Sequence, residues 1–424
     1  MTDASAPLTM NAPASLITDD GKPLKAALAS SLAVRRRRAL LLVAPLFLFI
    51  FVTFIVPIGQ MLFQSVHNDS FRANAPALVE WFGQNPQGSE LDETAYAALA
   101  SDLRTMQQNR SAGVAGTRIN YDVPGTRSLF TSAVRNAGQL EPPYKEALIA
   151  QDRKWADPNV WRAMRSASAA FTGDFFLNAV DLTRDENGKI VSVPEGQAVY
   201  KGLFWRTIVM SLEITALCLI LGFPIAFLLS SVKMKHAMLL MILVLLPFWT
   251  SLLVRTTSWM VLLQQQGVVN DILVWLGLIR NDQRLEMMYN ATGTIIAMTH
   301  ILLPFTILPL YSVMKTIPPS YVRAARSLGA TSWTAFRRVY LPQTLPGVGA
   351  GGLLVFILAM GYYITPALVG GADGQMISNM IAFHMQRSLN WSLAAALSAI
   401  LLAIVLIFFW IYDRLVGIDK MKLG

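Results

Sequence analysis

The chain has 424 residues, of which 54% are hydrophobic and 14% are charged, and its formal net charge is +9 at pH 7. A mean hydropathy of +0.45 is too high for one large soluble core, and the apolar residues form blocks long enough to cross a bilayer. The positive charges lie beside those blocks and form no basic surface with interleaved aromatic residues, which argues against nucleic acid as a partner.

The N-terminal part of the chain predicts a tail followed by a membrane helix. Residues 1–38 are rich in Ser, Ala, Thr and Pro with little periodicity, so we expect a disordered tail. Its last four residues are arginines, which places this tail in the cytoplasm by the positive-inside rule. Residues 39–65 then predict the first transmembrane helix.

A polar insertion follows at residues 66–201, and we expect it to be mainly helical and extracytoplasmic. Apolar spacing predicts helices near residues 90–108 and 143–171, and a turn at 185–188 leads into a short strand. A small core would form around Trp81, Trp155 and Trp161. Two interpretations stay open: a cap without chemistry of its own, or a docking surface for an extracytoplasmic partner.

Residues 202–413 predict a core of five further transmembrane helices, and residues 414–424 a cytoplasmic tail. The apolar runs lie near residues 204–230, 238–262, 292–313, 348–369 and 392–412. Lys and Arg gather at alternate ends of these runs, which places both termini and the loop 316–345 in the cytoplasm. The whole pattern predicts an all-α polytopic membrane protein with about six transmembrane helices.

The loop at 316–345 predicts two short helices joined at a corner. Pro318 and Pro319 suit the first turn of a helix, where a missing N–H has no partner. Gly329 suits the left-handed residue that ends this helix. Thr331 or Ser332 would cap a second helix that Pro342 ends.

This loop resembles the signature of the membrane subunits of binding-protein-dependent ABC importers. In that family a cytoplasmic loop carries Glu-Ala-Ala, three residues, Gly, nine residues, a β-branched residue, one more, and Leu-Pro. The positions that match without a gap are Ala324, Ala325, Gly329, Val339, Leu341 and Pro342. Arg323 stands where the family has Glu, which puts in doubt any ion pair made there but not the helix–Gly–helix shape.

Several strings look like the spermidine/putrescine permease branch of that family. They are PFWTS at 247–251 with VRT at 254–256, PALVGG at 366–371, NWSLAA at 390–395 and YDRLV at 412–416. The resemblance runs from about Lys201 to the C-terminus and more loosely covers the first helix, so the insertion stands outside it. Permeases for ferric iron, opines, phosphonates and amino-acid-type solutes share such strings and remain alternatives.

The resemblance implies a bacterial inner-membrane subunit that forms a translocation path without cofactor. Its partners would be an ATP-binding subunit in two copies, a homologous second permease and an extracytoplasmic substrate-binding protein. The helix containing Arg323, Ala324 and Ala325 would be the coupling helix that docks on the ATPase. The chain itself has no phosphate-binding loop, metal-ligand cluster or nucleophile elbow, so we expect no enzyme. A secondary transporter would leave the loop unexplained.

Polar residues inside the apolar runs are candidates for the translocation path. Glu213 lies near the middle of its run, where an ionisable side chain is costly. It would meet a cationic substrate, or it would form a structural pair with Arg206 or Arg255. Arg255 and Thr256 lie between two tryptophans, which also fits a side chain that extends to the membrane surface. For the last two candidates, Tyr362 and Tyr363, lining a passage and anchoring the packing remain equally open.

Overall fold

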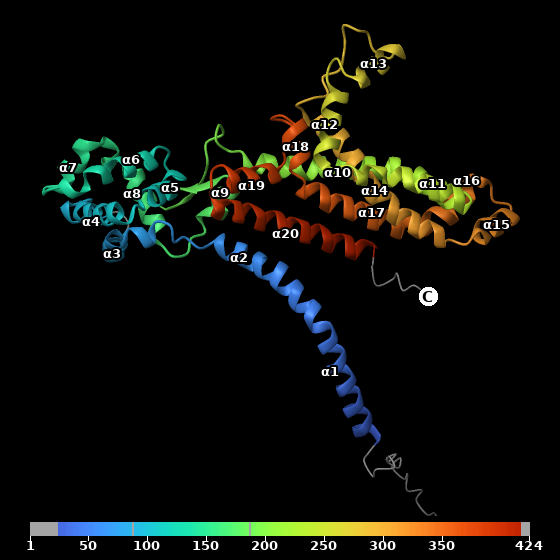
Figure 1. Ribbon diagram of the computed structural model, residues 1–424, viewed down its shortest axis with the longest axis horizontal. Coiled ribbons are helices and arrows are strands. Elements are labelled where there is room, and N and C mark those ends of the chain that lie inside the picture. The colour runs from blue at the N-terminus through green and yellow to red at the C-terminus, as the bar shows by residue number, and fades with distance from the viewer. Residues whose placement is uncertain (1–23, 87–88, 186–187, 417–424) are drawn as a thin grey trace, which may run out of the picture. The chain divides into compact units, whose positions relative to one another are not determined.

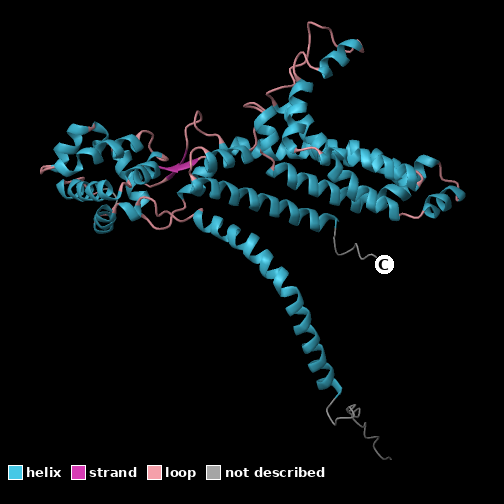
Figure 2. Ribbon diagram, in the orientation of Figure 1, coloured by secondary structure: helices cyan, strands magenta, loops and turns pink. Residues whose placement is uncertain are grey.

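The computed structural model describes residues 24–86, 89–185 and 188–416, in which helices dominate and one short hairpin supplies the strands (Figures 1 and 2). The predicted all-α class is therefore confirmed. The chain divides into two units, residues 1–61 and residues 62–424, and each is described by itself.

The first unit is a long apolar helix. It runs through α1 (Leu24–Ile50), a π-helical turn η1 (Phe51–Ile55) and α2 (Val56–Gln64), and residues 32–64 are long and apolar enough to cross a membrane. The expectation of a disordered tail up to residue 38 is wrong for residues 24–38, because α1 already begins at Leu24. Residues 1–23 of the expected tail lie outside the described part of the chain.

The polar insertion folds as a cluster of short helices around an apolar core (Figure 1). Trp81, Trp155 and Trp161 are all buried in this core, as predicted. Its elements are η2 (Arg72–Asn74), α3 (Pro76–Gln84), α4 (Glu93–Asn109), α5 (Ala112–Asn120), α6 (Thr126–Ala133), η3 (Val134–Gln139), α7 (Tyr144–Gln151), η4 (Arg153–Ala156), α8 (Pro158–Ser168) and α9 (Asp174–Ala179).

Side-chain caps decide where these helices begin. The helix expected near 90–108 is α4, whose N-cap Asp92 accepts a hydrogen bond from the backbone N–H of Ala95 at 3.1 Å. The single helix expected over 143–171 is instead broken into α7, η4 and α8. Asp152 and Asp157 are extended, and each side chain caps a new turn two residues on.

A two-stranded hairpin leads from the insertion toward the core. Strands β1 (Leu182–Arg184) and β2 (Ile190–Ser192) are antiparallel, with Thr183 opposite Val191. At the turn, the backbone N–H of Asp185 donates to the carbonyl of Lys189 at 2.9 Å. The predicted turn and strand are therefore present, although residues 186–187 lie outside the described part.

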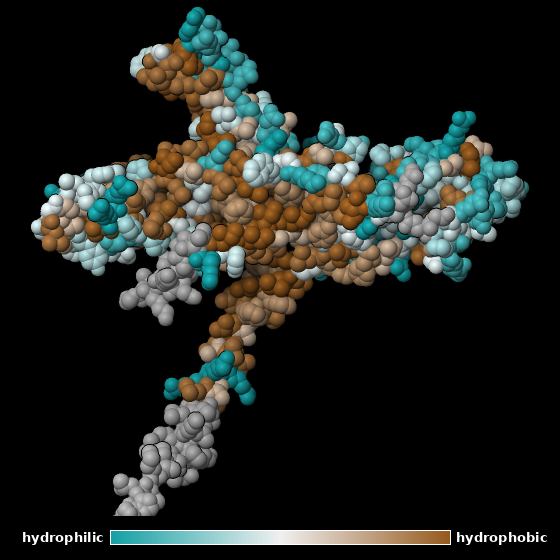
Figure 3. Space-filling view, turned by 180° about the vertical axis from the view of Figure 1, so that it is seen from behind, coloured by the Kyte–Doolittle hydropathy of each residue, from teal (hydrophilic) through white to brown (hydrophobic). Residues whose placement is uncertain are grey.

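The core contains long apolar helices that lie side by side, and its middle is hydrophobic while its two ends are hydrophilic (Figure 3). Together with the first helix at residues 32–64, five helices of the described residues are long and apolar enough to span a membrane, or six if one bent pair is counted as a span, in agreement with the predicted total of about six. The elements are α10 (Tyr200–Ser231), α11 (Met234–Leu245), η5 (Leu246–Trp249), α12 (Leu252–Leu263), α13 (Val268–Trp275), α14 (Ala291–Thr316), α15 (Pro319–Ser327), α16 (Ser332–Ala335), η6 (Phe336–Tyr340), α17 (Leu341–Gly361), α18 (Ile364–Val369), α19 (Ile377–Gln386) and α20 (Trp391–Val416).

Small residues let α10, α14 and α17 approach closely. A Cβ atom added to Gly222 of α10 would lie 3.2 Å from Thr306 of α14, and one added to Gly351 of α17 would lie 3.1 Å from the carbonyl oxygen of Thr306. Gly347 faces Val313 of α14 at 3.0 Å in the same way. In a bilayer, where lipid competes for apolar surface, such close backbone contact holds helices together.

Two of the predicted spans are broken. The run at 238–262 bends by 95° between residues 249 and 252, so α11 and α12 point in different directions. Pro247 lies in the 3₁₀ turn before the bend, and the Ser251 side chain caps α12 by accepting from the N–H of Val254 at 3.2 Å. The run at 348–369 is also interrupted, because helix α17 ends at Gly361.

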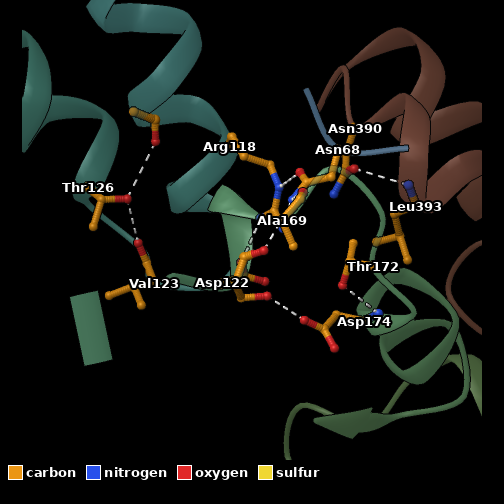
Figure 4. A network of polar contacts seen from close by, with 12 residues as sticks. Asn68, Arg118, Asp122, Val123, Thr126, Ala169, Thr172, Asp174, Asn390 and Leu393 are labelled. Atoms are coloured by element: carbon orange, nitrogen blue, oxygen red, sulfur yellow. Dashed lines mark hydrogen bonds and ion pairs between the residues drawn. The ribbon is translucent and has the colours of Figure 1, made fainter. Parts of the chain in front are cut away.

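A buried arginine joins the two ends of the insertion (Figure 4). The Arg118 guanidinium donates from Nε to Asn68 and from Nη1 to Asp122, both at 2.6 Å. Asn68, where the chain enters the insertion, also donates its backbone N–H to the carbonyl of Ala170 at 3.0 Å. The chain therefore enters and leaves this domain at one place.

The carboxylate of Asp102 gives the insertion a pH-dependent stability. It accepts backbone hydrogen bonds from Ala77 at 3.0 Å and Leu78 at 2.8 Å, at the start of α3. Burial raises its pKa from 3.8 to about 6, although these two bonds act in the opposite direction. Because the folded state holds the proton more tightly, this group stabilises the fold most below its unfolded pKa, and that stabilisation is lost as pH rises through about 6. The rise corresponds to about 3 kcal/mol at most.

We predict that protection of the α3 amides falls between pH 4 and pH 7, measured by hydrogen exchange on the full chain in detergent. Asp102→Asn should flatten this dependence, since the amide does not titrate. Asp92→Asn is the matched control, because Asp92 also caps a helix but is exposed, and its side-chain hydrogen bond from Thr94 and its backbone bond from Ala95 lower its pKa. An unchanged pH dependence in Asp102→Asn would refute the assignment.

Candidate coupling and translocation sites

The expected coupling helix is α15, and it ends as predicted at Gly329. The backbone of Gly329 has a φ of +90°, in the left-handed region. Around this corner, the N–H of Leu328 donates to the carbonyl of Ala324 at 3.1 Å, and the N–H of Ala330 donates to that of Ala325 at 3.1 Å. A Cβ added to Gly329 would meet nothing within 4 Å, so the backbone angle, and not crowding, makes glycine the suitable residue.

The second helix of the loop does not end where the sequence predicts. Thr331 caps it, accepting from the N–H of Thr334 at 3.2 Å, but residues 332–361 then form one continuous helix through α16, η6 and α17. Pro342 lies in the first turn of α17, directly after the π-helical turn η6. A wider turn leaves room for a residue without an N–H, so Pro342 does not end the helix.

The docking face, defined here as the exposed side chains of residues 321–338, combines apolar and basic groups. Tyr321, Leu328 and Trp333 are 51%, 89% and 68% exposed. Arg323 and Ala324 are also exposed, whereas Ala325 and Leu341 are half-buried against the chain. The sequence has no acidic residue between Met287 and Ala372, so the cations around this face lack acids from their own segment. They are Lys315, Arg323, Arg326, Arg337 and Arg338.

Aromatic rings attach the docking face to the transmembrane core. Phe227 of α10 lies 5.4 Å from Tyr340 and 6.0 Å from Phe336 between ring centroids, both edge to face. Phe223, one turn earlier on α10, also packs on Phe336 at 6.2 Å. The sequence pattern did not single out these residues. The spacing of four between Phe223 and Phe227, and between Phe336 and Tyr340, places each pair on one helix face and could have indicated the contact. These rings pack the docking face directly against α10.

Glu213 lies on an exposed face of α10 and takes part in none of the ion pairs within the described ranges. The predicted alternative of a pair with Arg206 is not formed, because Arg206 donates to the carbonyl of Ala372 at 2.9 Å. A pair with Arg255 is not formed either. The opposite face of α10 carries Thr207, Ser211, Cys218 and Gly222, all buried against the neighbouring helices.

Arg255 is close enough to Tyr362 to act on it electrostatically, and Thr256 follows Arg255 in α12, but no hydrogen bond or ion pair of the described chain joins Glu213 to any of them. Thr256 is buried and lies 3.3 Å from the hydroxyl of Thr365 in α18. Residues 362 and 363 form the break between α17 and α18, with Tyr362 half-buried and Tyr363 exposed. Their carbonyls accept hydrogen bonds from Ser378 at 2.6 Å and Asn379 at 2.8 Å, which satisfies the freed backbone.

No group of three or more His, Cys, Asp or Glu side chains suited to a metal ion occurs in residues 24–86, 89–185 and 188–416. Two of the histidines in the core helices, His300 and His384, make ordinary hydrogen bonds. His300 accepts from Trp259, and His384 lies 2.8 Å from the hydroxyl of Tyr200.

Comparison with known proteins agrees with this geometry. Residues 197–417 match the family model described as the inner membrane component of binding-protein-dependent transport systems. The spermidine/putrescine permease PotB of Haemophilus influenzae is 37% identical over 216 residues, covering 51% of this chain and 75% of that protein. PotB of Escherichia coli K12 is 35% identical over 222 residues, covering 52% and 80%. The inner membrane permease YdcU of the same organism is 32% identical over 228 residues, covering 51% and 72%.

Among solved structures, a bacterial alginate ABC transporter in complex with its pentasaccharide-bound periplasmic protein is 20% identical, with a TM-score of 0.43, and covers 53% of this chain and 80% of that chain. At this score it adds nothing to the assignment. The insertion lies before the matched residues. The family match, the sequence relatives and the membrane helices together confirm the predicted resemblance to the spermidine/putrescine permease branch. The chain belongs to the family of non-enzymatic inner membrane permease subunits of binding-protein-dependent ABC importers.

Proposed function

We propose that this permease imports polyamines of the spermidine/putrescine class. The observation that carries the proposal is the 35–37% identity to spermidine/putrescine permeases over 222 and 216 residues. The exposed carboxylate of Glu213 in α10 supports it, because a polyamine is a cation that a carboxylate in the path would attract.

The complex we propose contains this chain, a homologous second permease, two copies of an ATP-binding subunit and an extracytoplasmic binding protein. The N- and C-termini and the docking face lie in the cytoplasm, as the distribution of Lys and Arg supports. The binding protein delivers solute to the opposite side. ATP binding closes the ATPase pair, and α15 passes this movement to α10 through the aromatic contacts of Phe336 and Tyr340. Since solute shifts such an equilibrium through unequal affinity for its two states, the path must bind it differently in each.

The deciding experiment is ATP hydrolysis by the complex purified from native membranes and placed in lipid. The binding protein is added with putrescine, spermidine, ferric iron or an amino-acid-type solute, one at a time. Stimulation by a polyamine alone supports the proposal. Stimulation by another solute discards the polyamine assignment and keeps the importer.

Gly329→Asp should abolish association with the ATPase while the chain still inserts. A side chain at φ +90° costs roughly 1 kcal/mol or more and turns α15 against the following helix. The matched control is Gly277→Asp, which has a φ of +69° and, like Gly329, no atom within 4 Å of an added Cβ, but lies outside the docking face. Co-purification of the ATPase is the measurement. Equal recovery with both variants contradicts the docking role.

Arg323→Glu should also reduce assembly, since the docking face carries four arginines and its partner surface must be acidic. We expect a loss of about tenfold or more in ATPase affinity, because a like charge placed against acids costs several kcal/mol. Arg387→Glu, at another exposed arginine near α19, serves as the control. If the two reversals weaken assembly equally, Arg323 has no particular part in docking.

Glu213→Gln should lower polyamine-stimulated hydrolysis about tenfold and leave assembly intact. The neutral amide loses the charge-assisted contact with a cationic solute, a contact of about 1.5–3 kcal/mol. Glu286→Gln removes an exposed carboxylate from the segment before α14 and should have no such effect. Unchanged stimulation in Glu213→Gln would remove Glu213 from the path.

A further inference from the structure

A cluster of hydrogen-bond donors lies where α12, α14 and the break between α17 and α18 meet. α12 contacts both α14 and α18. Arg255 of α12 is close enough to His300 of α14 and to Tyr362 to act on both electrostatically. The sequence predicts Arg255 and Tyr362 as residues of the translocation path, but its pattern does not connect them with His300.

Trp259 fixes the form of His300. Its indole N–H, which can only donate, points at Nδ1 of His300 at 3.1 Å, and the two rings meet edge to face with centroids 5.3 Å apart. Nδ1 is therefore an acceptor, and the proton of the neutral ring lies on Nε2. The second ring nitrogen is thus a donor, and it makes no hydrogen bond within the described residues.

Arg255 adds a positive charge that its surroundings do not balance. Its Nε is buried and has no hydrogen-bond partner in the part of the chain that the structure describes. The ion pairs of the described ranges do not include it. The elements around it contain no acidic residue at all, since α12, α14, α17 and α18 have no Asp or Glu.

A half-buried guanidinium with one buried, unpartnered N–H and no counter-charge is unfavourable in a membrane, and its fork matches a carboxylate in shape and hydrogen bonding. We propose that Arg255, with His300 and Tyr362, forms a binding site for a carboxylate. The site rests on the importer complex of the proposed function, whose path it completes, and not on the polyamine as its solute. The carboxylate comes from the transported solute or from an acidic side chain of the second permease.

Trp259 is a positioning residue in this site. It holds the His300 ring so that Nε2–H is free to donate, while the Thr256–Thr365 contact fixes α12 beside α18. Polyamines carry no carboxylate. If they are the cargo, the second permease supplies the acid. If the solute supplies the acid, the cargo is of the amino-acid type and the polyamine assignment fails while this site stands.

The test compares Arg255→Gln and Arg255→Lys with the unsubstituted complex in lipid, and uses Arg206→Gln as a matched control within a membrane helix. Putrescine and ornithine are the solute probes, because ornithine is the same diamine with one carboxylate added. Recovery of the second permease and the melting temperature of the complex are read without solute. Stimulated ATP hydrolysis is read with each probe.

A tenfold or greater loss of ornithine stimulation in Arg255→Gln, with assembly intact, assigns the carboxylate to the solute. Loss of the second permease, or a lower melting temperature without solute, assigns it to the partner. In either case Arg255→Lys should retain part of the affected readout, whether stimulated ATP hydrolysis or assembly. His300→Gln keeps a hydrogen-bond donor, so it should retain more of that readout than His300→Ala. Full assembly with an unchanged melting temperature and less than a twofold change for both probes overturns the site. Failure of the proposed function is distinct, because putrescine would then not stimulate ATP hydrolysis by the unsubstituted complex.

Discussion

The close contact of α10, α14 and α17 determines how the rest of the core is arranged. Gly222, Gly347 and Gly351 bring the backbones of these helices together around Thr306. Because lipid chains compete for apolar side chains, such backbone proximity is the main attraction available inside a membrane. The buried polar residues of α10 use this contact: the hydroxyl of Thr207 accepts the N–H of Ile377 at 2.8 Å, and the thiol of Cys218 donates to the carbonyl of Thr299 at 3.4 Å. Charged side chains of these helices that find no partner in this packing therefore indicate contacts outside the chain.

Glu213 on α10 and Arg255 on α12 carry charges of opposite sign within the apolar helices of the core. Neither forms an ion pair in the described ranges. Lipid cannot cover either group at reasonable cost, so each must face water, solute or another polypeptide. The two charges lie on different elements and have different neighbours: Glu213 is on an exposed apolar face, whereas Arg255 adjoins His300 and Tyr362. An incomplete set of charges is what a subunit of a larger membrane complex should show.

Sequence alone predicted the elements that depend on local patterns. Apolar runs of spanning length gave the membrane helices, and Gly329 gave the end of α15, because its left-handed backbone is a local requirement. The break at Tyr362 and the bend before Leu252 were not predicted, because both runs are apolar throughout. Tertiary contacts satisfy these breaks: Ser378 and Asn379, from a later helix, hold the free carbonyls of Tyr362 and Tyr363. The place of His300 beside Trp259 could not be predicted either, because it depends on contact between α14 and α12.

The insertion, although outside the family match, is joined to the core by more than a linker. Asp181 accepts the backbone N–H groups of Val199, Tyr200 and Lys201, at 3.0, 3.0 and 2.7 Å, and so caps the first turn of α10. Phe175 and Ala179 of α9 pack in one apolar cluster with side chains of α10 and α20.

A chain of hydrogen bonds adds to this connection. The hydroxyl of Tyr200 lies 2.8 Å from Nε2 of His384, and Nδ1 of His384 lies 2.8 Å from the hydroxyl of Ser388. Tyr121 of the insertion donates to the carbonyl of Ser388 at 3.3 Å. A force applied to the insertion therefore reaches the first turn of α10, whose other end carries Phe223 and Phe227 against the docking face. One continuous helix, α10, thus links the insertion to the docking face.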